Sequence, residues 1–133
     1  MMFLPNGALV AVVDGEQLVL FKNTGHTDPV LTAMEIPDMP ERVSGASAHR
    51  SSAANPDNDT QAEDGYAMGV AEMLNSWALA GKFEALLVVA APRTLGELRK
   101  HWHKDLEAKL IGEINKDLTG RTTAEIAAAI DKA

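Results

Sequence analysis

The feature that most constrains the fold is a run of six apolar residues that begins at Leu86 in the middle of the chain. Such an uninterrupted run is typical of a strand that is buried on both faces, and we expect it to form a central strand up to Ala90. Pro92 ends the run, because proline has no amide hydrogen for a neighbouring strand. Thr94 and Glu97 then match the capping box that opens a helix. Arg93 is therefore predicted to lie where a central strand gives way to a helix, which is where open α/β sheets place their binding crevices.

The composition excludes several classes of protein. The 133 residues include no cysteine, which excludes disulfide frameworks, thiolate zinc sites and thiol catalysis. The net charge is −7, with 19 acidic and 12 basic residues, and an acidic surface repels phosphate backbones. Autonomous nucleic-acid binding is therefore not expected, although a local basic patch is compatible with this balance. No segment approaches the roughly 20 apolar residues of a membrane span, and no signal peptide is recognised. We expect one domain over residues 1–133, in the cytoplasm, with no cofactor and no membrane contact.

The first part of the chain predicts an antiparallel meander of three strands. Apolar segments at 8–13, 17–22 and 30–36 alternate or run as strands do. Asp14-Gly15 separates the first two, and this dipeptide favours a hairpin because both residues tolerate positive φ. The segment from about 37 to 61 is different, since it is rich in Pro, Ser, Ala, Asn and Asp and poor in large apolar residues. We expect a long loop there, which is either functional or mobile.

The remainder alternates helices with strands. Residues 62–80 carry apolar side chains at helical spacing, and Gly81 follows as the expected helix-ending residue. Helical segments are expected at about 95–102 and from 105. Residues 111–118 suit either a helix or a strand, and we favour a strand. Thr122 and Glu125 form a second capping box, which opens a terminal helix. Three antiparallel strands followed by helix-strand-helix-strand-helix is the order of a ribonuclease-H-like mixed sheet, which places the chain in the α/β class.

Four blocks of sequence resemble a known family. They are the Asp14-Gly15 hairpin, the helix that ends in Ala80-Gly81-Lys82-Phe83, the run from Val89 to Lys100, and the segment from Ile114 to Thr119. Together they resemble the host attachment proteins, also called proteins required for attachment to host cells. These are bacterial relatives of the middle domain of eukaryotic release factor. The resemblance covers nearly the whole chain and implies the same ribonuclease-H-like fold.

Two departures from the pattern limit what the resemblance implies. The family commonly has Ala-Pro-Pro-Arg where this chain has Ala90-Ala91-Pro92-Arg93. The release factor also carries a Gly-Gly-Gln motif, which triggers peptidyl-tRNA hydrolysis, and this chain has none. Release-factor chemistry therefore cannot be assigned to any residue here.

The strongest candidate site is centred on Arg93. Its guanidinium and the amides at the start of the following helix could hold an anion such as phosphate or carboxylate. We therefore predict an anion-binding or partner-binding site made of the following residues: Arg93, Thr94, Arg99, Lys100, Lys116 and Asp117. The alternative is structural: Arg93 would form a salt bridge with Asp117 or Asp14 and tie strands together.

Other arrangements of reactive side chains are weaker candidates. A ribonuclease-H-like fold suggests a metal-dependent nuclease, and Asp14 and Glu72 could supply two of its carboxylates. The end of the central strand, however, offers Arg93 where a third acid is needed. His101 and His103 lie two apart and would not face one metal from a helix. The Ser and His residues of the 37–61 segment show no nucleophile-elbow spacing.

These observations favour a non-enzymatic interaction module that acts near translation or the ribosome through the Arg93 edge. The first alternative is a small hydrolase of nucleic acid or esters at the same edge. The second takes the family name literally, as an indirect factor for attachment to host cells. The absence of Gly-Gly-Gln, of a complete carboxylate triad and of a nucleophile elbow argues against an enzyme.

Overall fold

The fold is built on a five-stranded mixed sheet. We analysed a computed structural model that describes residues 4–26, 30–34 and 58–132. The strand order is β3-β2-β1-β4-β5. The strands are β1 (Leu9–Val13), β2 (Leu18–Asn23), β3 (Leu31–Met34), β4 (Leu86–Ala90) and β5 (Leu110–Asn115). β1 and β2, and β2 and β3, pair antiparallel, whereas β4 is parallel to β1 on one side and to β5 on the other. The predicted meander and the predicted interior position of the Leu86 strand are both confirmed.

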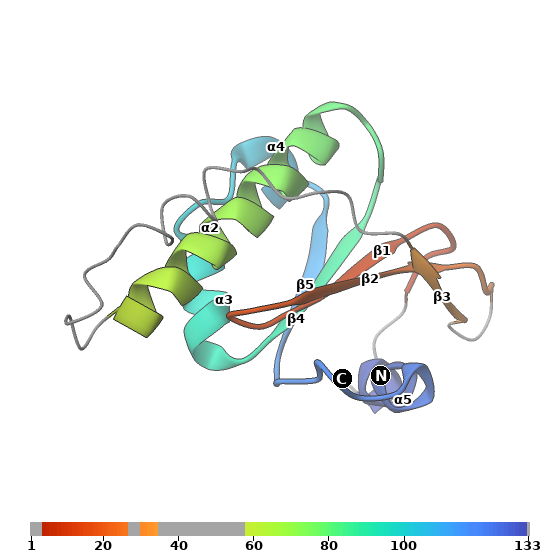
Figure 1. The fold of residues 1–133 in the computed structure, drawn as a ribbon. Helices are drawn as coiled ribbons and strands as arrows, with labels where there is room; N and C mark the ends of the chain where they lie inside the picture. The colour runs from red at the N-terminus through yellow and green to blue at the C-terminus, as the bar shows by residue number, and fades with distance from the viewer. Residues whose placement is uncertain (1–3, 27–29, 35–57, 133) are drawn as a thin grey trace.

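Helices cover both faces of this sheet. Three helices lie on one face: α2 (Asn58–Leu79), α3 (Pro92–Arg99) and α4 (Lys104–Glu107). The terminal helix α5 (Thr123–Lys132) lies on the other face, as Figure 1 shows. The α/β class and the predicted element order are thus confirmed, and this architecture is compatible with a release-factor-like domain. None of the described helices is long and apolar enough to cross a membrane.

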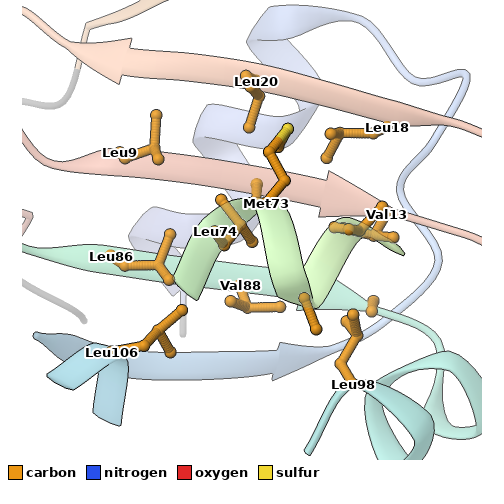
Figure 2. Close-up of a cluster of buried hydrophobic side chains, with 14 of the residues drawn as sticks. Leu9, Val13, Leu18, Leu20, Met73, Leu74, Leu86, Val88, Leu98 and Leu106 are labelled. Carbon is orange, nitrogen blue, oxygen red and sulfur yellow. The ribbon is translucent and has the colours of Figure 1, made fainter. Parts of the chain in front are cut away.

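Alternation along the strands supplies one apolar core for each face. On β1, Leu9, Ala11 and Val13 point toward α2, whereas Val10 and Val12 point toward α5. The α2-side core gathers Leu74, Leu86, Leu98 and Leu106 around the sheet (Figure 2). The α5-side core is completed by Ile126 and Ile130. A strand buried on both sides must be apolar at every position, which explains the continuous run that begins at Leu86.

The end of α2 has the helix-ending glycine that the sequence predicts. Gly81 has a φ of +72° after the end of α2. The amide of Gly81 donates to the carbonyl of Ala78, and that of Lys82 donates to the carbonyl of Trp77. These two bonds form a Schellman motif, in which glycine accepts the left-handed conformation without a steric penalty.

The capping box of α5 is also confirmed. The amide of Glu125 donates to Thr122 Oγ1 at 3.1 Å, and the amide of Thr122 donates to Glu125 Oε1 at 3.0 Å. The pair therefore satisfies two amide donors at the start of the helix.

The capping box predicted at Thr94 and Glu97 is wrong. Helix α3 begins at Pro92, with Ala91 as its N-cap and no side-chain capping bond, so Thr94 lies inside the helix. Proline fits the first helical position because its fixed φ matches the helix and its missing amide hydrogen is not needed there. The hairpin predicted at Asp14-Gly15 is confirmed by the antiparallel pairing of β1 and β2, although neither residue has a positive φ. The Asp14 side chain stabilises this turn instead, through bonds described below.

Several boundaries also differ from those expected. α2 begins at Asn58, so it includes the end of the segment predicted to be a loop. The rest of that segment, and residues 35 and 36 of the third expected strand, lie outside the described residues. The ambiguous region is a strand, as favoured, but it spans Leu110–Asn115, and residues 116–118 follow it as a connection.

Candidate polar site at the carboxyl edge of the sheet

The candidate site lies where the three parallel strands end. β1 ends at Val13, β4 at Ala90 and β5 at Asn115, and these residues are aligned across the sheet. The chain continues from them into Asp14, Pro92-Arg93 and Lys116-Asp117 respectively. Polar side chains from three distant segments therefore lie along one edge of the sheet, as they do in open α/β sheets.

Asp14 organises the turn between β1 and β2. Its Oδ1 accepts the backbone amides of Glu16 and Gln17, each at 2.7 Å. Its Oδ2 accepts the side-chain amide of Gln17 at 3.4 Å and the hydroxyl of Thr119 at 2.7 Å. Burial alone would raise the pKa of Asp14, but the hydrogen bonds outweigh it and lower the pKa below its ordinary value of 3.8. Asp14 is therefore a carboxylate at neutral pH.

Thr119 links Asp14, which lies early in the chain, to the connection that follows β5. Its hydroxyl oxygen lies 2.7 Å from Asp14 Oδ2 and also 2.7 Å from Asp117 Oδ1. A hydroxyl carries one proton, so it can donate to only one of these carboxylates at a time. The amide of Thr119 also donates to Asp117 Oδ1 at 3.3 Å. The two carboxylates are thus held around one hydroxyl, although Asp14 and Thr119 are 105 residues apart in sequence.

Tyr66 of α2 adds a phenol to this cluster. Burial raises the pKa of Tyr66, and the negative charge of Asp14 raises it further. The phenol therefore keeps its proton at neutral pH, so it can donate a hydrogen bond but is a poor nucleophile.

Arg93 contacts α2 rather than the neighbouring strands. Its Nη2 lies 3.1 Å from Asp64 Oδ1, and the Arg93 side chain is 52% exposed. The alternative in which Arg93 pairs with Asp14 or Asp117 is therefore wrong about the partner, because the start of α2 brings Asp64 over the first turn of α3. Exposed ion pairs of this kind contribute at most about 1 kcal/mol to stability.

The other predicted cations are not all brought to this site. Arg99 and Lys100 follow at the opposite end of α3. Arg99 donates to Glu113 of β5 at 2.6 and 2.9 Å, and this carboxylate raises the pKa of Arg99. Lys100 donates to Glu97 at 3.1 Å. Both cations are thus paired with acids, so the predicted extension of the anion site along α3 is electrostatically weakened.

Lys116 lines a separate depression. This surface, which we call the α5 groove, has a volume of about 290 Å³. It lies between the loop that follows β5 and the outer side of α5. The groove is lined by Lys116, Leu118, Arg121, Glu125, Ala128, Ala129 and Lys132.

The histidines and Glu72 do not form a metal site. Within the described part of the chain, no group of three His, Cys, Asp or Glu side chains could hold a metal ion. His101 pairs with Glu97 at 3.1 Å, and Trp102 packs partly buried against the α2-side core. Asp14 is engaged in the turn. The nuclease-type carboxylate set therefore receives no support from these residues.

The sequence did not single out Asp64, Tyr66 or Thr119. Tyr66 has helical spacing with core residues, which hid its position at the edge. Asp117 and Thr119, two apart after a strand, carry a recognisable signal, because short polar side chains at such spacing bond to nearby backbone. Asp64 has no such signal, since its role depends on how α2 packs on α3.

A comparison with protein families adds an independent observation. The model of bacterial archaeo-eukaryotic release factor family 12 matches residues 7–130. The chain belongs to this family. The match covers the sheet, most of α5 and every residue of the edge described above, so the relationship to release factors predicted from the four sequence blocks is confirmed. A comparison with curated proteins gives no match.

Proposed function

We propose that this protein is a non-enzymatic interaction module that docks onto an RNA-containing complex of translation, such as the ribosome, in the cytoplasm. Membership of a release-factor family is the observation that carries the proposal. The absence of Gly-Gly-Gln removes the residues that the release factor uses for hydrolysis. Without that motif, family membership supports a common binding partner rather than a common reaction.

The docking surface in this proposal is the carboxyl edge, with Arg93 at its centre. Arg93 is half exposed, and α3 starts there without a side-chain cap, so backbone amides at this end supplement its charge. The exposed pairing with Asp64 is weak enough for an anionic partner to replace it. Thr94 and Asp117 belong to the same proposed surface, where the Asp117 carboxylate opposes an anion, whereas Lys116 lines the α5 groove. Host attachment stays a prediction from the resemblance, as an indirect effect of this activity.

A hydrolase is the second candidate, and one observation favours it. The Thr119 hydroxyl touches the Asp14 carboxylate at 2.7 Å, which is the distance of a nucleophile from its base. Two facts oppose this. The lowered pKa makes Asp14 a weak base at neutral pH. The second carboxylate, Asp117, would repel the oxyanion that forms during acyl or phosphoryl transfer. We therefore favour docking.

The test is co-sedimentation of the purified chain with bacterial ribosomes. Arg93→Ala should reduce the fraction that sediments, and the reduction should shrink as salt rises. Its melting temperature should stay nearly unchanged, because the Arg93 side chain is half exposed and an exposed ion pair such as that with Asp64 contributes at most about 1 kcal/mol. Lys104→Ala, which removes an exposed cation on α4, is the matched control and should sediment like the wild type. If the wild-type chain does not sediment with ribosomes, or if Arg93→Ala melts far lower but sediments normally, the proposal is wrong.

A further inference from the structure

The α5 groove concentrates positive charge on an acidic protein. Among the described residues that line the groove, Lys116, Arg121 and Lys132 contribute three cations and Glu125 contributes one acid. The chain as a whole carries a net charge of −7. The described lining of the groove therefore carries an excess of positive charge, and a concave surface with such an excess attracts anionic ligands.

Glu125, the acid in the groove, already accepts hydrogen bonds at the start of α5. Glu125 Oε1 accepts the amide of Thr122 at 3.0 Å and its hydroxyl at 3.2 Å. These bonds lower the pKa of Glu125, and Arg121 beside it contributes less. Arg121 lies 3.7 Å from Glu125 Oε2, at the long end of ion-pair distances, and both side chains are more than half exposed. The helix cap thus holds the carboxylate in place, and the three cations outweigh it.

The floor of the groove is made of small apolar side chains. Glu125, Ala128, Ala129 and Lys132 are spaced three and four apart, so they share one side of α5. Ile126 and Ile130 turn toward the sheet instead. The alanine side chains are small, and the described residues that line the groove include no aromatic ring. Bases are held on proteins largely by stacking on aromatic rings. A nucleic acid in this groove would therefore be held through its backbone.

We propose that the α5 groove binds the phosphate backbone of an RNA segment in the partner complex. This inference rests on the proposed function, which supplies the RNA, and it assigns the contact to a surface distinct from Arg93. The planar guanidinium of Arg121 matches two phosphate oxygens, and the two lysines add point charges on either side. The connection 116–119 joins the groove to the carboxyl edge, because Thr119 bonds to Asp14.

The experiment is an NMR titration of the ¹⁵N-labelled full chain with a hexauridylate RNA at low salt. The amide shifts of Leu118, Arg121, Ala128 and Lys132 should move most. With three phosphates contacted, the affinity should fall about 20-fold between about 50 and 200 mM salt. The triple variant Lys116→Gln, Arg121→Gln, Lys132→Gln should lose the response. Ala128→Gln, which fills the floor without changing the charge, should weaken it, and Lys104→Gln should leave it intact.

Three results would overturn the proposal. The largest shifts could fall outside the groove, or the triple variant could respond like the wild type. A hexaglutamate peptide could also produce shifts as large as the RNA, which would indicate an acidic peptide as the occupant. The titration needs no ribosome, so its outcome is separate from that of the co-sedimentation. If the groove fails while ribosome binding persists, docking occurs elsewhere; if the groove responds and ribosomes are not bound, the partner proposal is the one at fault.

Discussion

At the scale of single residues, the hydrogen bonds on Asp14 couple the charge of this carboxylate to stability. A group whose pKa is lowered in the folded state stabilises that state above its ordinary pKa, and the stabilisation is lost as the pH falls through the folded value. For Asp14 this loss begins near the ordinary value of 3.8 and continues below it. Thr119→Val removes one donor, so the pKa of Asp14 should rise and the free energy of unfolding at neutral pH should fall by about 1 kcal/mol. NMR titration of the carboxyl carbon and urea unfolding measure the two effects. Thr119→Ser keeps the hydroxyl and should restore both; an unchanged pKa in Thr119→Val would mean that the backbone amides alone hold the charge.

The same residues show how far the sequence could predict the site. The sequence placed Asp14, Arg93 and Asp117 at strand ends, and this required only the strand pattern and the rule for parallel sheets. It did not predict that Asp14 meets Thr119 or that Arg93 meets Asp64. These contacts join segments 105 and 29 residues apart. Their partners are decided by how the elements pack, and no local spacing records that.

At the scale of elements, two glycines allow a stability test: Gly65 lies within α2, and Gly81 follows the end of this helix. A Cβ at Gly65 would meet nothing within 4 Å among the described residues, so there is room for a methyl group. Gly65→Ala should raise the free energy of unfolding by about 0.5–1 kcal/mol, because alanine loses less backbone entropy in a helix. Gly81→Ala should lower it by about 1–2 kcal/mol, because an L side chain is strained at a φ of +72°. Thermal and urea unfolding measure both. Destabilisation by Gly65→Ala would instead mean that this turn of α2 meets chain outside the described residues.

Comparison of α3, α5 and β5 shows why some helix and strand boundaries differ from those predicted from the sequence. Thr94-x-x-Glu97 is a valid capping box in isolation, yet Pro92 starts α3 earlier because its ring favours the first helical turn. In α5 no proline competes, and Thr122-x-x-Glu125 caps as its sequence predicts. The range expected for β5, 111–118, extends past Asn115 because Ile114 and Leu118 suggested continued alternation. As the edge strand it is only partly buried, so its apolar pattern is weak.

At the scale of the whole molecule, the two faces of the sheet share the strands β1 and β4, which are buried on both sides. We therefore expect residues 1–133 to behave as a single domain whose two cores unfold together. Leu74→Ala in the α2-side core and Ile130→Ala in the α5-side core remove side chains that are fully buried. Each should cost about 2–5 kcal/mol, and each should lower the stability of both layers by the same amount, because the transition is cooperative. Ile111→Ala, at a β5 side chain that is 39% exposed, is the control and should have a small effect. Native-state amide exchange measures the free energy of opening at β1, α2 and α5 separately. If Ile130→Ala weakened protection in α5 alone and left α2 unchanged, α5 would be a separately unfolding element, and the α5 groove would lie on a surface that opens without the rest of the fold.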